Sequence, residues 1–495
     1  MKTILKIILF SFISSFLLLD LASCKKDKLI TDAGSKLQFS QDSVLFDTVF
    51  TTIGSSTQNI RIRNKNNQRI KISAIELVGG SASAFILNVD GSPGRSFTDI
   101  EIAAHDSMYI FIQVNVNPGG NMPFIINDAI KFVVNENIQT VYLEAWGQDA
   151  YYHYPTDAIK FKDGSYLPFS YLNNDTNAIN VTWPNDKPHV IYGYLVVYTN
   201  QTLTINAGVQ VYLNYKAGLW VYQKGELHVK GQKGNEVTFQ GARREKDYAD
   251  EPGQWDRIWI NEGSDKNEID YAIIKNGYIG IQAENLGTAS GLNPNAVRRL
   301  KLTNTKIQNM SLWGLYGLCF NIYGGNNVIS SCQEHSVNLE LGGKYTFIHC
   351  TFANFWNKDK ARDKPALNVN NHTDSDVWPM DSAYFGNCII AGKLGNEVNL
   401  DLDFSDNTNQ PGIIFSSCWL RTTNNTSDVN KYINVSKGDG LDFKDYGKYN
   451  LEVHATDSQI RGFTDPKALI DVQKFPFDLN NIARNTTSVT VGAYN

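Results

Sequence analysis

The sequence predicts an all-β protein in which a β-sandwich is followed by a solenoid of short strands. Two observations lead to this prediction. From Leu37 to Asp149, short runs of alternating apolar and polar residues are separated by turns rich in Asn and Gly. Between Tyr192 and Ile281, similar runs end repeatedly in Gly or Asn, and no stretch of roughly ten residues has helical spacing. Such punctuation indicates half-buried strands that are joined directly to one another.

The N-terminal residues have the pattern of an export signal. Lys2 and Lys6 precede an apolar run from Ile7 to Leu19, and Leu21-Ala-Ser-Cys24 follows. A basic start, a short apolar run and small residues before a cleavage site are typical of a secretory signal peptide. The motif resembles a bacterial lipobox, which implies cleavage before Cys24 and a lipid on its sulfur. The alternative is an ordinary signal peptide with a chance cysteine.

We therefore expect residues 1–24 to be a lipoprotein signal and residues 25–36 to be a flexible tether, because the latter are short and polar. The lipid would place the protein at a membrane of the cell envelope, with the outer membrane preferred.

Composition limits the classes of function. The chain has 495 residues, 42% of them hydrophobic and 12% aromatic, which is enough for two or three domains with a sizeable core. Its formal net charge is −5 and it contains no basic cluster. We expect no nucleic-acid partner, because nucleic-acid binding requires a basic surface.

The region 37–150 is expected to be an immunoglobulin-like sandwich. About seven short strands in ~110 residues are the signature of this fold. The segments Phe46-Asp-Thr-Val49, Ile60-Arg-Ile-Arg-Asn64 and Ile110-Phe-Ile-Gln-Val114, with Pro118 soon after, resemble the Ig-like repeats named for abnormal-spindle and hydin proteins. That resemblance implies a spacer or a binding platform, and we favour a stalk. Residues 151–182 are expected to be a junction, in which Tyr151-Tyr-His-Tyr-Pro155 buries the domain boundary or, alternatively, stacks on sugars.

The region 183–460 resembles a right-handed parallel β-helix of the pectin-lyase-like kind. The resemblance rests on Thr202-Leu-Thr-Ile-Asn-Ala-Gly208, Gly225-Glu-Leu-His-Val-Lys-Gly231, Pro252-Gly-Gln-Trp-Asp-Arg-Ile258 and Ile269-Asp-Tyr-Ala-Ile-Ile-Lys-Asn276. It implies an architecture that hosts many functions, so it predicts the fold more than an activity. Residues 461–495 resemble the closing segment of such helices, with Asn481 where the family usually has Gly. We expect this segment to cap the open coil.

A repeat predicts where the cysteines lie. Six segments align on a small residue, at positions 272, 305, 332, 350, 388 and 418. In a β-helix, equivalent positions stack into ladders inside the coil. We therefore expect Cys332, Cys350, Cys388 and Cys418 to fill one ladder. Disulfides and a zinc site are not expected, because five cysteines remain after Cys24 and none forms a CxxC pair.

Two groups of residues are candidates for ligand binding. An insertion at 357–381 contains Asp374, Asp376 and Asp381 with Trp378, and carboxylates beside rings suit a sugar or a calcium ion. The pair Asp401 and Asp403 lies two residues apart and so on one side of a strand. The alternative for both groups is solvated acidic residues. No other cofactor is expected.

The charged insertion between Gly241 and Gly253 is expected to be a corner loop or, alternatively, a functional one. Trp255 and Trp259, four residues apart, are expected to share one side of a strand and to pack in the core.

No catalytic residue can be assigned. Neither Asp-Asp nor Gly-His-Gly, which galacturonan hydrolases of this fold carry, occurs in the chain. We expect a non-catalytic protein that binds a glycan or another envelope component. The alternatives are a polysaccharide lyase or glycoside hydrolase and a purely structural role. Binding predicts a groove lined with rings and amides, whereas catalysis predicts converging acid, base or calcium ligands on one face of the coils.

Overall fold

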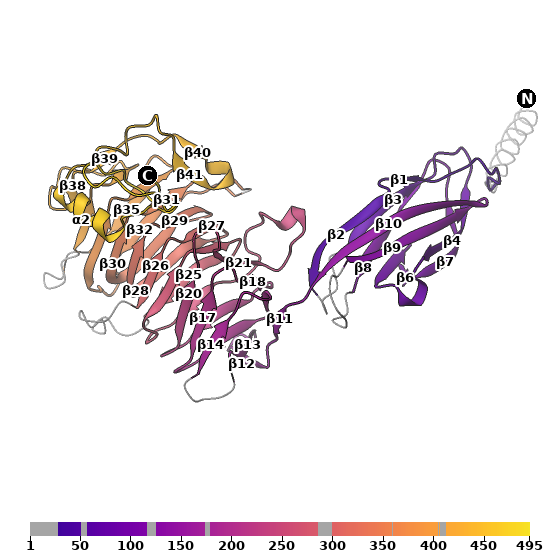
Figure 1. Ribbon diagram of the computed structural model, residues 1–495, viewed down its shortest axis with the longest axis horizontal. Helices are drawn as coiled ribbons and strands as arrows, with labels where there is room; N and C mark the ends of the chain where they lie inside the picture. Colours follow the sequence, from indigo (N-terminus) through magenta and orange to yellow (C-terminus); the bar gives the residue numbers. More distant parts are fainter. Residues whose placement is uncertain are drawn as a thin grey trace, which may run out of the picture. The chain divides into compact units, whose positions relative to one another are not determined.

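The computed structural model describes residues 28–50, 57–115, 125–173, 179–285, 299–358, 360–403, 405 and 412–495. Almost all regular elements of the described residues are strands, and the chain divides into two units, residues 1–149 and 150–495 (Figure 1). The all-β class and the order of sandwich and solenoid are therefore confirmed. Cys24 and the expected signal lie outside the described residues. In the described part of the chain, no helix is long and apolar enough to cross a membrane.

The first unit is a sandwich of two five-stranded sheets. One sheet has the order β1 (Gln38–Phe39), β3 (Gln58–Arg63), β8 (Ser107–Val114), β5 (Phe85–Val89), β6 (Ser92–Gly94). The other has the order β2 (Ser43–Phe50), β10 (Asn137–Gln148), β9 (Ile125–Val134), β4 (Ile70–Leu77), β7 (Ser96–Ile102), and a short 3₁₀ turn, η2 (Gly80–Ala82), follows β4. On β3, Ile60 and Ile62 are fully buried whereas Arg61 and Arg63 are exposed, because side chains alternate across a strand.

The described part of the expected tether, residues 28–36, lies against the sandwich. The backbone N–H of Ile30 donates to the carbonyl of Arg69 at 2.9 Å. The Asn135 amide donates to the carbonyl of Asp32 at 3.1 Å, and Asn137 donates to Ala33. These bonds hold the segment in place, so the flexible tether predicted for residues 25–36 is wrong for residues 28–36.

The second unit is a parallel β-helix, as predicted (Figure 1). The strand pairings arrange its coils into three parallel stacks, which we call the first, second and third sheets. The first sheet consists of β13 (Tyr166–Tyr171), β16 (Tyr194–Val197), β19 (Gly218–Val221), β22 (Ile258–Ile260), β25 (Ile279–Glu284), the first halves of β28 (Trp313–Gly325) and β30 (Val337–Ile348), β32 (Leu367–Asn370) and β35 (Val398–Asp401). The second consists of β14 (Asn180–Trp183), β17 (Thr202–Asn206), β20 (Glu226–Lys230), β23 (Asn267–Asp270), β26 (Leu300–Thr303), the second halves of β28 and β30, β33 (Met380–Gly386), β36 (Ile413–Ser416) and β38 (Tyr432–Ile433). The third consists of β11 (Tyr151–His153), β15 (His189–Ile191), β18 (Gln210–Leu213), β21 (Val237–Gly241), β24 (Ala272–Lys275), β27 (Lys306–Met310), β29 (Val328–Cys332), β31 (Thr351–Asn354), β34 (Ile389–Gly392), β37 (Trp419–Leu420) and β39 (Ser436–Lys437).

Apolar ladders fill the interior of the coils. One of them runs in direct register through the first sheet and consists of Leu219, Ile258, Ile281, Leu315, Val337, Leu367 and Val398. All seven side chains are fully buried. Burial of each such side chain contributes about 1.5–3 kcal/mol, so this ladder accounts for much of the cohesion between coils.

The β-helix starts and ends earlier than the predicted range 183–460. Residues 151–182, expected to be a junction, already supply strands to all three sheets, and β12 (Asp157–Lys160) pairs antiparallel with β13. Pro168 lies within β13 and makes this strand hard to recognise in the sequence, because proline cannot donate to a ladder. The ring of Tyr154 stacks on that of Tyr192 at 4.8 Å, so it packs on the first coil. The last coil strand, β39, ends at Lys437.

The cysteine ladder is confirmed for three cysteines and wrong for one. At the corners of six successive third-sheet strands, β24, β27, β29, β31, β34 and β37, a residue with positive φ precedes the ladder position, which holds in turn Ala272, Thr305, Asn327, Cys350, Cys388 and Cys418. Cys332 lies instead opposite Met310 at the far end of β29. The position of Cys332 and the ladder position look alike in sequence, because each follows a large hydrophobic residue by three places. Asn327 replaces Cys332 in the ladder and accepts the N–H of Thr305 at 3.1 Å.

The C-terminal residues cover a flank of the β-helix (yellow in Figure 1). The segment contains β40 (Phe443–Asp445), the 3₁₀ turn η4 (Tyr446–Lys448), β41 (Asn450–Val453) and α2 (Pro466–Lys474). Its apolar side chains pack on the outer side of the third sheet, against Ala353, Ile389 and Trp419.

Hydrogen bonds around Asp478, Asn481 and Arg484 hold this segment in place. Asn481 has φ of 62°, as predicted from its place in the motif. The buried Asp478 carboxylate accepts the N–H of Ile482 at 2.8 Å, and the Arg484 guanidinium donates to Asn326 of the coil at 2.9 Å. Burial lowers the pKa of Arg484 to about 10. The motif that resembles the family's closing segment therefore fixes the C-terminal residues to the coils.

Candidate functional site

The outer side of the first sheet carries a row of ring and amide side chains that crosses successive coils. In direct register lie Trp220, Trp259, Gln282, Tyr316, Asn338, Asn368 and Asn399. We call these seven residues the polar-aromatic row. Neighbouring members are about 4.8 Å apart, since they stand on adjacent strands.

Aromatic rings dominate the N-terminal end of the row. The rings of Trp220 and Trp259 stack with their centroids 4.9 Å apart and 15° from parallel. One register position along, Tyr198 and Tyr222 stack at 5.3 Å. Both tryptophans are half-buried, so their outer edges remain in contact with solvent. This end therefore presents a surface of ring edges that spans several coils.

A carboxylate organises the middle of the row. Glu284 accepts hydrogen bonds from Trp259 Nε1 at 2.7 Å, Asn261 Nδ2 at 2.9 Å and Gln282 Nε2 at 2.6 Å. Arg257 in turn donates to Gln282 Oε1. The side chains around Glu284 are thereby held in one arrangement, because each polar atom has a defined partner.

Two tyrosine–carboxylate pairs flank this centre. The Tyr316 hydroxyl donates to Glu340 at 2.9 Å, and the Tyr194 hydroxyl donates to Asp256. Burial, followed by the neighbouring carboxylate, raises the pKa of both phenols far above the usual range. Both tyrosines therefore stay protonated near neutral pH and act as hydrogen-bond donors.

Amides form the C-terminal end of the row. Asn368 donates to Asn338 at 2.8 Å, and Asn399 donates to Asn368 at 2.8 Å. Asn338 and Asn368 each use one donor and one acceptor in this series, whereas Asn399 only donates. The exposed Asn399 therefore retains its amide oxygen for a ligand. The next register position holds Asn370 and Asp401, joined at 3.3 Å.

The structure brings only part of the predicted acidic set to this site. Asp401 lies at the end of the row, where it accepts from His372 at 3.2 Å and thereby raises the pKa of that imidazole. Asp403 follows and its backbone N–H donates to the Asn371 side chain at 2.8 Å. Asp374 and Asp376 are exposed in a tight hairpin.

The remaining predicted residues do not join a common site. Trp378 closes that hairpin through its backbone N–H, which donates to the Asn371 carbonyl at 2.7 Å. Asp381 is exposed on β33, in the second sheet. Among the residues that the structure describes, no group of three or more His, Cys, Asp or Glu side chains is placed to hold a metal ion.

The expectation that Trp255 and Trp259 share one side of a strand is wrong. Trp255 precedes β22 and is buried, with its Nε1 bound to the Lys275 carbonyl at 2.8 Å, whereas Trp259 faces outward on β22. A sequence signal for the row was present in Gly218-Leu-Trp-Val221 and Ile258-Trp-Ile260. In both segments a tryptophan stands between two apolar residues that point inward, so alternation along the strand predicts that the tryptophan points outward.

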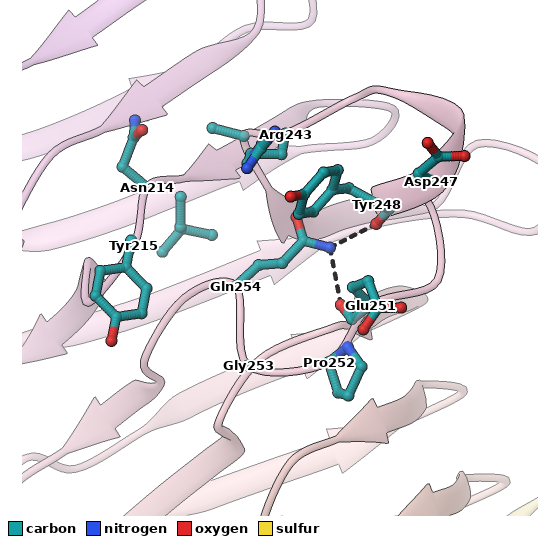
Figure 2. Close-up of a pocket in the computed structure, with 11 residues that line it drawn as sticks. Asn214, Tyr215, Arg243, Asp247, Tyr248, Glu251, Pro252, Gly253 and Gln254 are labelled. Atoms are coloured by element: carbon teal, nitrogen blue, oxygen red, sulfur yellow. Dashed lines mark hydrogen bonds between the residues drawn. The ribbon is translucent and has the colours of Figure 1, made fainter. Parts of the chain in front are cut away.

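The charged insertion builds a pocket of about 670 Å³ at the corner before the first sheet (Figure 2). Its walls include Tyr215, Arg243, Tyr248, Glu251 and Gln254. Gln254 closes the base of the loop, because its amide donates to the carbonyls of Tyr248 at 2.6 Å and Glu251 at 2.8 Å (Figure 2). The Arg243 guanidinium lies 3.4 Å from the centre of the Tyr248 ring.

Contacts with later coils and with the C-terminal segment hold the insertion, which includes the 3₁₀ turn η3 (Lys246–Tyr248), in place. The Asp250 carboxylate accepts from the Tyr449 hydroxyl at 2.6 Å and from Lys358 at 3.3 Å. Asn309 donates to the Asp250 carbonyl at 2.9 Å. The pocket is therefore preformed, and its residues Tyr215 and Gln254 lie three and four residues before the strands that carry Trp220 and Trp259.

No protein-family model and no curated protein matches the chain. Solved structures match parts of it. The ASH/PapD-like domain of human CEP192 (PapD-like domain 7) is 12% identical over 24% of this chain and 92% of that chain, with a TM-score of 0.18. A family 123 glycoside hydrolase from Clostridium perfringens is 11% identical over 22% of this chain and 23% of that one, with a TM-score of 0.16. The E. coli chaperone DraB is 7% identical over 28% of this chain and 82% of that one, with a TM-score of 0.17. TM-scores this low say nothing about function.

Proposed function

We propose that this protein is a non-catalytic glycan-binding protein of the bacterial cell envelope, attached by a lipid on Cys24. A sugar chain lies along the first sheet of the β-helix, with successive residues over the polar-aromatic row. The observation that carries this proposal is the direct register of two stacked indoles, a tyrosine and four amides on one outer side of the coils.

The chemistry of the row suits a polymer of hydroxyl groups. Rings offer apolar surface to the C–H faces of a sugar, and their N–H and O–H groups add directed hydrogen bonds. Asn and Gln side chains both donate and accept, so they match hydroxyls, which also do both. Five members of the row reach the surface on successive coils, namely Trp220, Trp259, Tyr316, Asn368 and Asn399, whereas Gln282 and Asn338 are buried between them. The accessible members offer a series of contacts along the coil axis to an extended chain.

Binding is favoured over catalysis because side-chain donors already occupy the carboxylates of the row. Glu284 accepts three such bonds, and Glu340 accepts from Tyr316 and Asn338. A general base needs an oxygen within reach of the substrate proton, and these oxygens are engaged elsewhere. The pocket beside the row provides a further surface for a branch or a chain end.

The test uses the soluble form, from Lys25 onward, and a panel of neutral and uronate-containing polysaccharides, with and without calcium. Affinity electrophoresis measures retention, while absorbance of unsaturated uronates and reducing ends measure product release. We expect retention by at least one polysaccharide without products. Products would overturn the non-catalytic assignment, and absence of retention would overturn glycan binding.

Matched variants locate the site. Trp220→Ala and Asn399→Ala, one at each end of the row, should each weaken retention by roughly tenfold, the loss that corresponds to about 1.4 kcal/mol. Lys301→Ala serves as the control, because Lys301 is exposed on the second sheet. Equal retention of row and control variants would place the glycan elsewhere.

A further inference from the structure

The two outer faces of the sandwich differ in whether their cationic side chains are paired with carboxylates. On the face formed by β4, β7 and β9, carboxylates pair with the cations: Lys71 with Asp99 at 2.6 Å and Lys131 with Glu76 at 2.9 Å. Beside β4, Arg69 pairs with Glu101 at 3.4 Å. On the opposite face, Arg61, Arg63 and Lys65 follow one another along and just beyond β3, and among the described residues no carboxylate pairs with any of them.

These three cations surround a small cavity. Its volume is about 210 Å³, and it is lined by Gln38, Phe39, Ser40, Arg61, Arg63 and Lys65. Among the described residues, none that lines it is acidic. Arg61 and Arg63 stand on the same side of β3, about 6.8 Å apart along the strand. The cavity therefore concentrates positive charge at the edge of the sheet formed by β1 and β3.

Ser40 supplies an oriented hydroxyl at this cavity. Its N–H donates to the Arg61 carbonyl at 2.9 Å, and its Oγ accepts the N–H of Arg61 at 3.0 Å. Since the oxygen already accepts a bond from the chain, the hydroxyl hydrogen can be given to a further acceptor. Guanidinium groups remain charged at any ordinary pH and their planar N–H forks match oxyanions.

Aromatic rings continue the surface away from the cavity. On β8, Tyr109 lies opposite Arg61, and Phe111 is the next outward residue. The two rings are 50% and 44% exposed and stack with centroids 6.4 Å apart. Exposed rings next to unpaired cations form a surface for a ligand that has both an anionic group and an apolar face.

We propose that this cavity binds an oxyanion carried by a sugar chain, with a sugar ring resting on Tyr109 and Phe111. Phosphate, sulfate and carboxylate share the required chemistry. A bound oxyanion removes the repulsion among three unneutralised cations. An anionic membrane surface fits less well, because the two rings stand on the central strand β8 and not on a loop that could enter lipid.

The test compares charge-matched variants of the full soluble form. Arg61→Ala/Arg63→Ala removes two unpaired cations, whereas Lys71→Ala/Lys131→Ala removes two cations from the opposite face. Affinity electrophoresis in dextran sulfate, with neutral dextran as reference, measures binding at low and high salt. We expect the arginine variant to bind at least roughly tenfold more weakly than the lysine variant, and salt to weaken native binding.

Two further arms decide the nature of the ligand. Tyr109→Ala/Phe111→Ala should weaken binding to dextran sulfate. The concentration of inorganic phosphate that competes with this binding should stay unchanged, because phosphate contacts only the cations. Trp220→Ala in the β-helix should leave retention by dextran sulfate unchanged, so this site and the polar-aromatic row are tested separately. Equal binding by the two double-cation variants would overturn the proposal. Sedimentation with phosphatidylglycerol vesicles without retention by dextran sulfate would assign the face to a membrane.

Discussion

The indole rings of Trp220 and Trp259 lie 4.9 Å apart and nearly parallel, although the whole charged insertion separates them in the sequence. The parallel pairing of β19 with β22 sets this relationship, because it puts equivalent residues of neighbouring coils one strand spacing apart. Trp259 also donates to Glu284 of the next coil, at 2.7 Å. One side chain therefore contacts both neighbouring coils.

Replacing Trp259 with alanine should lower the stability of the β-helix by about 2–4 kcal/mol, because both the ring stack and a hydrogen bond to a buried carboxylate are lost. Denaturant unfolding followed by tryptophan fluorescence measures this loss. Tyr215→Ala is the control, since Tyr215 is 74% exposed and its removal should change stability by less than about 0.5 kcal/mol. Equal effects would show that the stack contributes nothing.

The buried ion pair between Arg362 and Glu397 gives a second prediction. Arg362 donates to Glu397 at 2.5 and 2.8 Å, and both side chains are almost fully buried. Glu397→Gln should cost about 3–5 kcal/mol, because it leaves a buried guanidinium without its counter-charge. Urea unfolding measures the change. Lys301→Ala, which breaks the exposed pair with Glu268, should cost less than about 1 kcal/mol.

Acid should destabilise the start of the β-helix. His153 and His189 face each other at 3.0 Å, and His189 stacks on Trp183 at 3.7 Å. Burial lowers the pKa of His153 to about 4 and, together with His153, that of His189 to about 3. The unfolded chain, with a histidine pKa of about 6.5, then binds more protons than the folded chain below that pH.

The stability supplied by the neutral histidine pair is therefore complete above pH 6.5 and is lost as the pH falls toward 4. Thermal unfolding between pH 7.5 and pH 4 should show this decline. His189→Gln should reduce its steepness, whereas His454→Gln, at an exposed position, should leave the profile unchanged. A profile that His189→Gln does not alter would contradict the assignment.

The five cysteines beyond Cys24 should be unreactive in the folded protein. All five are buried as free thiols, and burial raises the pKa of Cys332 to about 12 and that of Cys319 to about 11. Since the thiolate is the reactive form, a disulfide reagent at pH 8 should label none of them in the soluble form and all five after unfolding in guanidinium. Rapid labelling of the native protein would show that the coil opens at the cysteine ladder.

Local features of the sequence predicted the fold class well. Alternation with Gly and Asn punctuation indicated strands, and the stacking of Cys350, Cys388 and Cys418 followed from a repeat whose members are close in type. The left-handed turn at Asn481 also followed from the residue itself, since Asn tolerates positive φ. These features depend on side-chain alternation and backbone preference, which short segments already contain.

Only the tertiary structure decided the register of the coils and the composition of the candidate site. Coils of unequal length shifted Cys332 out of its ladder and joined Trp259 with Glu284 and Tyr316 with Glu340. The tertiary structure also placed the C-terminal segment on a flank of the β-helix, where the buried Arg484 donates to Asn326. The physical reason is that a residue's neighbours in a solenoid are set by how many residues each turn consumes, and this number is determined by packing across the coils and not by any single segment.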